Sequence, residues 1–206
     1  MLHLTFDRIK KIVNCQLSIV NCQNGFTLLE ILIGFAIFGL ISLLVAAIYL
    51  AQFRLFSNQN TLVDVASQNK LALDEVTNQI RESQTVVASC CGAETTSQSV
   101  LVLRLWPQDA GGEPQDPNGV AYDYIIYRQD SPDNTKLIKK IAADPSSSRN
   151  SGTNIIANSV SNLQFTYDNA DPTLASQVTI SLTNSQVSGA KTHTITQEAS
   201  AVLRNK

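Results

Sequence analysis

Apolar and polar residues alternate along the chain in three different ways, and the first is a long run with almost no polar positions. Residues 26–53 are predominantly apolar, and no charged side chain occurs from Ile31 to Gln52. About 20 apolar residues, each adding roughly 1.5 Å, cover a hydrocarbon core about 30 Å thick. Gly34 and Gly39 would let neighbouring helices approach closely in lipid. The run predicts a membrane-spanning helix, and its length disfavours the alternative of a buried core helix.

The second pattern is an amphipathic helix that continues the first. Apolar residues recur at steps of three and four, with Asn69 on the same line: Leu62, Ala66, Leu73, Val76, Ile80 and Val87. No proline interrupts the chain from Phe26 to Val87. One helix is therefore predicted from about Thr27 to about Val87, with its second half packed on a soluble domain.

The third pattern, after Ser89, consists of short strand-like segments separated by Gly-, Pro- and Asp-rich turns. Strands are predicted at residues 100–106, 121–127, 136–141, 163–167, 178–182 and 192–196. The predicted fold class is α+β, a long N-terminal helix packed on an antiparallel β-sheet domain. The predicted divisions are residues 1–25, 26–56 for the membrane half of the helix, 57–88 for its amphipathic half, and 89–206 for the β-rich domain.

Charge adds the expected orientation in the membrane. Residues 1–25 carry Arg8, Lys10 and Lys11 against Asp7, so the positive-inside rule keeps this end in the cytoplasm. The β-rich domain would then lie outside it. A secretory signal peptide is cleaved after its apolar region, whereas here the small residue Gly25 precedes the run. The formal net charge of −2 gives no electrostatic footprint for nucleic acid.

Glu30 is a carboxylate at the entrance of the apolar run. A carboxylate costs roughly 2.5–3.5 kcal/mol at the centre of a spanning helix and less near its end. Something outside the chain is therefore expected to compensate it. The alternative interpretation is that Glu30 only extends to the membrane interface.

The segment Gly25-Phe26-Thr27-Leu28-Leu29-Glu30, followed by Ile31-Leu32-Ile33, resembles the processing and assembly signal of type IV prepilins and type II secretion pseudopilins. The resemblance implies that a membrane prepilin peptidase cuts after Gly25 on the cytoplasmic side. The same enzyme would methylate the new N-terminus at Phe26. Glu30 would pair with the Phe26 amine of an adjacent subunit, since opposite charges about 4 Å apart attract by several kcal/mol where screening is poor.

The same resemblance implies the partners. These are the prepilin peptidase/methyltransferase, other pilin or pseudopilin subunits, an inner-membrane assembly platform and membrane lipid, with no nucleic acid. Residues 156–167 and 201–205 resemble the J-type minor pseudopilins and W-type minor pilins, which implies a minor subunit. Removal of residues 1–25 leaves 12 basic and 16 acidic side chains, a formal charge of −4.

Other candidate residues remain in the β-rich domain. Cys90 and Cys91 are adjacent, and a strained vicinal disulfide, free thiols and intermolecular bonding all stay open. Asp109, Glu113 and Asp116 form an acidic loop that calcium could use, but they lack the EF-hand spacing. Solvated acidic side chains are favoured there and at Asp168 and Asp171, so no cofactor or metal is expected.

His193 and Trp106 complete the candidates, and neither indicates catalysis. The sequence contains no Gly-x-Ser-x-Gly elbow, so a surface strand histidine is expected at His193. For Trp106, a core position at the end of a strand is favoured over the alternative of an exposed recognition aromatic. The predicted function is therefore a structural pilus or pseudopilus subunit and not an enzyme. The alternative is a single-pass membrane-anchored binding module or enzyme facing the periplasm or exterior.

Overall fold

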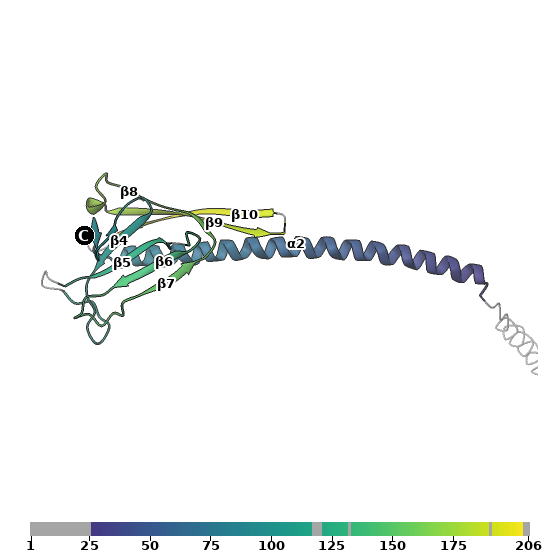
Figure 1. Cartoon of the computed structure of the whole chain (residues 1–206), viewed down its shortest axis with the longest axis horizontal. Helices are drawn as coiled ribbons and strands as arrows, with labels where there is room; N and C mark the ends of the chain where they lie inside the picture. Colours follow the sequence, from purple (N-terminus) through teal and green to yellow (C-terminus); the bar gives the residue numbers. More distant parts are fainter. Residues whose placement is uncertain (1–25, 117–120, 132, 190, 204–206) are drawn as a thin grey trace, which may run out of the picture. The chain divides into compact units, whose positions relative to one another are not determined.

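A computed structural model describes residues 26–116, 121–131, 133–189 and 191–203. The chain divides into two compact units, residues 1–53 and 54–206. The helix α2 (Leu28–Glu82) begins in the first unit and ends in the second. With its antiparallel sheets (Figure 1), the chain has the predicted α+β fold class.

Helix α2 ends at Glu82, five residues before the predicted end at Val87. The Ser83 hydroxyl donates to the Ile80 carbonyl at 2.7 Å, and the Ser83 N–H donates to the Gln79 carbonyl at 3.0 Å. These bonds satisfy carbonyls that the last helical turn leaves open. The chain then enters β1 (Thr85–Val86), which pairs with a strand of the larger sheet. The periodicity predicts that the helix includes Thr85 and Val86, but these two residues pair with the sheet instead.

The strands form two larger sheets and one small hairpin, all with antiparallel neighbours. The five-stranded sheet has the order β1-β4-β5-β6-β7, with β4 (Val100–Leu105), β5 (Asp123–Gln129), β6 (Leu137–Ala142) and β7 (Gly152–Ala157). The three-stranded sheet has the order β10-β9-β8, with β8 (Val160–Tyr167), β9 (Gln177–Ser188) and β10 (Lys191–Val202). Strands β2 (Ser89–Cys90) and β3 (Glu94–Thr95) pair together, and η2 (Pro172–Leu174) is a short 3-10 helix.

All six predicted strands are present, and their lengths differ from the prediction. β5 begins two residues later than predicted, and β9 and β10 each extend to 12 residues. β7 and the two-residue strands β1, β2 and β3 were not predicted. The turn expected at residues 117–119 lies outside the described residues.

The core of the second unit joins the C-terminal part of α2 to both larger sheets. From the helix it takes Ala72, Leu73, Val76 and Ile80, and from the sheets it takes Leu101, Leu103, Ile125, Tyr127, Phe165, Ile180 and Leu182, among others. The predicted helix stripe is correct at residues 73, 76 and 80. It is wrong at Leu62, which is 46% exposed, because Val65 lies on the buried line instead.

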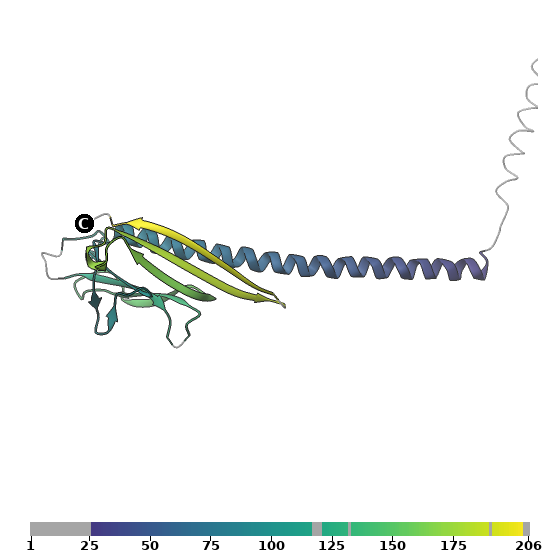
Figure 2. The ribbon, with the colours of Figure 1, turned by 90° about the horizontal axis from the view of Figure 1, so that it is seen from above.

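Polar contacts also tie α2 to each sheet. The buried Asn69 side chain donates from Nδ2 to the carbonyls of Leu182 in β9, at 3.3 Å, and Ile195 in β10, at 3.1 Å. On the other sheet, the Lys139 ammonium of β6 donates to Glu75 at 2.6 Å and to Gln79 at 2.9 Å. Asn69 is therefore the polar anchor between the helix and the β9–β10 hairpin, which lies beside α2 in Figures 1 and 2.

Replacement of Asn69 should distinguish a lost hydrogen bond from a buried charge. Asn69→Leu removes the two donations and should lower the free energy of unfolding by about 1–2 kcal/mol. Asn69→Asp places a carboxylate against two carbonyl oxygens and should lower it by about 3–5 kcal/mol at neutral pH. Urea unfolding of the detergent-solubilised full chain measures both. Equal losses in the two variants would contradict the assigned role of the Asn69 amide.

Candidate functional site

The candidate processing and assembly site lies at the N-terminal end of α2. Phe26 and Thr27 precede the helix, and Phe26 is 78% exposed. The backbone N–H of Glu30 donates to the Thr27 carbonyl at 3.0 Å and to the Thr27 hydroxyl at 3.3 Å. The N–H of Ile31 also donates to the Thr27 carbonyl, at 3.2 Å. Thr27 is therefore the N-cap residue of α2.

This cap explains why the helix begins where it does. Thr27 and Glu30 have the spacing of a capping box, in which a Ser or Thr is followed three residues later by Glu or Gln. Glu30 lies in the first turn, where the partial positive charge of the helix dipole favours a carboxylate. Thr27 as a cap was not identified from the sequence, although the Thr-x-x-Glu spacing was available to indicate it.

The apolar run that follows is exposed along its whole length within the first unit. Every large apolar side chain from Ile31 to Phe53 is between 49% and 73% exposed. A stretch of 18 residues within α2 has a mean hydropathy of 2.8 and contains no buried residue. By length and composition, α2 can therefore cross a membrane. A helix of the soluble core would instead bury one stripe or more. The described residues therefore leave this apolar surface uncovered, as expected for a helix suited to membrane anchoring.

Two glycines lie within this apolar surface. A Cβ built on Gly34 or Gly39 would meet no atom within 4 Å. Small residues on an apolar helix allow another helix to approach closely. Together with the lack of charge between Ile31 and Phe53, this makes the first part of α2 suitable for packing against other helices in lipid.

The structure does not place the complete predicted site. Gly25, the expected last leader residue, and the whole of residues 1–25 lie outside the described residues. Phe26 and Glu30 lie on either side of the Thr27 cap, and both are exposed. Cleavage after Gly25, methylation at Phe26 and assembly through Glu30 therefore stay predictions.

Cys90 and Cys91 lie where the β2–β3 hairpin turns. Both are free thiols, with Cys90 half-buried and Cys91 exposed. Cys91 has a φ of 54°, a left-handed conformation that non-glycine residues adopt rarely. Burial, followed by a hydrogen bond with Cys91, raises the pKa of the Cys90 thiol to about 12. Cys90 is thus held as a neutral thiol at physiological pH.

Three of the candidate acidic side chains, Asp109, Asp168 and Asp171, accept hydrogen bonds within turns. Asp109 accepts from the backbone N–H groups of Gly111, at 2.8 Å, and Glu113, at 2.9 Å. Asp168 accepts from the Ser176 N–H at 2.9 Å, and Asp171 caps η2 by accepting from Thr173. The Thr173 hydroxyl and then its N–H lower the pKa of Asp171. Among the described residues, no group of three or more His, Cys, Asp or Glu side chains could hold a metal. The expectation of no cofactor stays a prediction.

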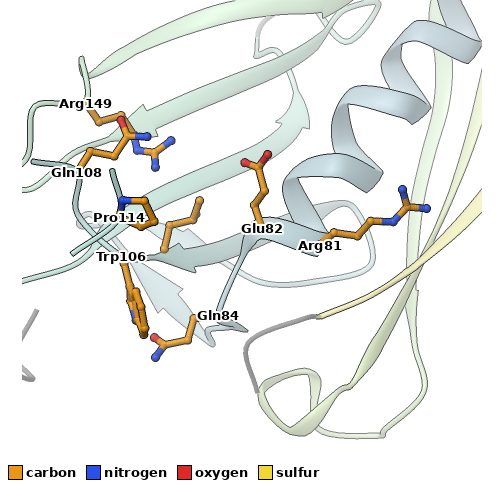
Figure 3. A pocket seen from close by; sticks show the side chains of 8 residues that line it. Arg81, Glu82, Gln84, Trp106, Gln108, Pro114 and Arg149 are labelled. Atoms are coloured by element: carbon orange, nitrogen blue, oxygen red, sulfur yellow. The ribbon is translucent and has the colours of Figure 1, made fainter. Parts of the chain in front are cut away.

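Trp106 follows β4 and lines a pocket of about 510 Å³ (Figure 3). The pocket is bordered by Arg81, Glu82, Gln84, Leu105, Trp106, Gln108, Pro114 and Arg149. Trp106 is half-buried there, so it is less enclosed than the predicted core position. Its indole N–H has no hydrogen-bond partner among the described residues.

The charged groups around this pocket are largely engaged. Arg149 donates to the fully buried Asp123 carboxylate at 2.9 Å, and Glu82 accepts from Gln79 at 3.0 Å. The lining contains no Ser, Cys or His. His193 is on β10, half-buried, and does not line the pocket. The pocket therefore brings together no nucleophile and base, and the absence of enzyme activity stays a prediction.

Comparison with known families gives a match at the N-terminal end of the chain. Residues 20–46 match the family model of the prokaryotic N-terminal methylation motif. The matched range contains Gly25, Phe26, Thr27 and Glu30 together with the first part of the exposed apolar helix. No curated protein matches the chain.

The motif and the fold together indicate a class of protein. They support a type IV pilin- or pseudopilin-like precursor, with an apolar helix suited to membrane anchoring and a globular unit beyond it. The motif implies processing by a prepilin peptidase and assembly with other pilins.

The contribution of the Thr27 cap can be measured directly. Thr27→Ala removes the hydroxyl that accepts from Glu30 and should destabilise the first turn by about 0.5–2 kcal/mol. Amide hydrogen exchange at Glu30 and Ile31 in micelles should then become roughly 2 to 30 times faster. Thr61→Ala is the control, because the Thr61 hydroxyl donates to Ser57 further along the same helix. Unchanged exchange in Thr27→Ala would contradict the capping assignment.

Proposed function

We propose that the chain is a minor structural subunit of a type IV pilus or type II secretion pseudopilus. It enters the cytoplasmic membrane as a prepilin, with residues 1–25 in the cytoplasm and the second unit outside. Prepilin peptidase cleaves it after Gly25 and methylates the new N-terminus at Phe26. The mature chain then leaves the membrane for the fibre. The observation that carries this proposal is the coincidence of the methylation motif with an exposed, uncharged helix.

Glu30 supplies the physical reason for assembly. The carboxylate stands at the start of an apolar helix, and no ion pair is formed by it among the described residues. Cleavage would create a cationic amine at Phe26 of every subunit. Contact between Glu30 of one subunit and this amine of a neighbour would neutralise both charges and fix the axial offset between their helices.

The alternative is a single-pass anchored binding module or enzyme, and the pocket beside Trp106 is the observation that favours it. An anchor by itself requires neither a methylation motif nor a carboxylate at its first turn. Epitope tags at both ends distinguish the two functions. In cells with prepilin peptidase, the mature protein should keep the C-terminal tag and lose the N-terminal one. Persistence of the N-terminal tag would overturn the proposed function.

The role of Glu30 is tested by removing its charge at constant size. Glu30→Gln should be cleaved as efficiently as the wild type, while its amount in sheared fibres falls at least tenfold relative to the membrane fraction. Asp64→Asn is the matched control, because Asp64 is an exposed carboxylate on the same helix, outside the apolar run. It should incorporate normally. Normal incorporation of Glu30→Gln would exclude the proposed contact.

A further inference from the structure

The outer strands of the two larger sheets differ in how their free edges are protected. β1 has two residues, and β7 has six and pairs with β6 through a register shift at Leu137/Ile138. β8 has a register shift at Val160/Asn162, and its Phe165 N–H donates to the Gln98 carbonyl at 2.7 Å. Short strands, bulges and covering loops are the usual means of preventing unwanted strand pairing. These three edges each use at least one of them.

β10 uses none of these means. It pairs with β9 over 12 residues, from Lys191 with Ser188 to Val202 with Gln177, without a register shift. The sheet order gives it no neighbour on its other side. The described residues also make backbone hydrogen bonds outside the helices and the paired strands. None of these bonds involves residues 191–202. Within the described part of the chain, a row of backbone donors and acceptors along β10 is therefore left without a backbone partner.

The register identifies which residues carry these groups. Pairing of Lys191 with Ser188 leaves a two-residue loop, and the pair closing such a loop is expected to be hydrogen-bonded. The odd-numbered residues of β10 then direct their backbone groups to β9, and the even-numbered residues direct theirs away. Asn69 contacts the carbonyl of the odd-numbered Ile195, so α2 does not occupy the outward groups.

The side chains along this edge also leave it open. The even-numbered residues are exposed, and all but the apolar Val202 are polar: Thr192, Thr194, Thr196, Glu198, Ser200 and Val202. Glu198 is the one charge among them. Edge strands that must stay unpaired commonly carry several charges or a proline. β-branched threonines, in contrast, favour an added strand.

We propose that β10 binds an extended strand of a different pilin-like subunit, which adds antiparallel to the β8–β9–β10 sheet as its fourth strand. This inference rests on the proposed function. Main-chain hydrogen bonds would provide the affinity, and the β-branched shape of the side chains, which valine shares with threonine, would set the register. The contact joins the second units of two subunits, separately from the Glu30 contact of the N-terminal helices.

The partner differs from this chain for two reasons. A two-fold contact between two copies would pair β10 of one copy antiparallel with β10 of the other. The second units of the two copies would then point in opposite directions. Subunits that enter one fibre from one membrane share a direction, which excludes that contact. A head-to-tail contact would need a complementary edge on the same chain, and the other outer strands of the larger sheets are shorter, bulged or bonded to a loop. The matching strand must therefore come from another chain.

Photo-crosslinking in cells that assemble the fibre tests the partner. A photoreactive amino acid is placed at Thr194 or Thr196 of the full chain, and at Thr166 in β8 as the control on the same sheet. Thr166 pairs with Thr179 of β9 and lies on the opposite outer strand. Positions 194 and 196 should give an adduct with a different pilin-like subunit, at least five times more than position 166. An adduct with a second copy, equal yields at all positions, or no adduct would overturn the proposal.

Proline tests the backbone contact itself. Thr194→Pro removes an outward N–H and keeps the ladder to β9, as prolines on edge strands do. It should reduce the adduct formed at Thr196 at least tenfold, while Thr194→Val leaves it unchanged. The urea midpoint of the solubilised full chain verifies folding, and Thr194→Lys replaces the proline variant if that one unfolds.

The outcomes separate this inference from the proposed function. A folded Thr194→Pro variant that still forms the wild-type amount of adduct overturns the role of the β10 edge. If the wild-type chain is cleaved and enters the fibre in that experiment, the proposed function stands. A wild-type chain that keeps its N-terminal tag would instead refute the function.

Discussion

An apolar helix surface that the described part of the chain leaves uncovered is the constraint on which the other features depend. From Ile31 to Phe53 the large side chains are about half exposed or more, and soluble monomers rarely expose contiguous apolar patches above a few hundred Å². Under the proposed function, lipid would cover this surface before assembly and other helices would cover it afterwards. The second unit has its own core, to which residues 26–53 contribute no side chain.

The single helix α2 meets two different requirements through a change in side-chain pattern. Its first part carries no charge after Glu30 until Arg54, so any face of it can contact lipid. Its second part buries one line of residues that includes Val65, Asn69 and Val76. Asn69 and Glu75 then connect that line to the two sheets. A purely apolar second half would have lost these directional contacts.

The sequence predicted the features that depend on strong local patterns. The apolar run and the stripe at Leu73, Val76 and Ile80 correctly predicted the helix and its buried face. β9 and β10 were predicted at less than half their length, because polar residues such as Asn184 and Gln186 interrupt the apolar alternation. Pairing between the two strands, which no single segment encodes, extends the hairpin.

Other features depended on contacts between distant segments. β7 begins with Gly-Thr-Asn and acquires its strand conformation by pairing with β6. The early end of α2 depends on β1 pairing with β4. In the candidate site, the motif located Phe26 and Glu30, whereas the Thr27 cap required the positions of the backbone N–H groups. The open edge of β10 also could not be predicted, since it follows from the order of strands in the sheet.

The Thr27 cap bears on how Glu30 can favour assembly. A carboxylate in the first turn of a helix gains typically 0.3–1 kcal/mol from the helix dipole. A carboxylate within a spanning segment costs up to roughly 2.5–3.5 kcal/mol, and less near the end. The dipole therefore lowers the cost of holding an ionised Glu30 at the start of a spanning helix. Under the proposed function, the cationic amine of a neighbour would lower this cost further. The cap geometry at Thr27 and the proposed pairing would then act on the same carboxylate, the first within one subunit and the second between two.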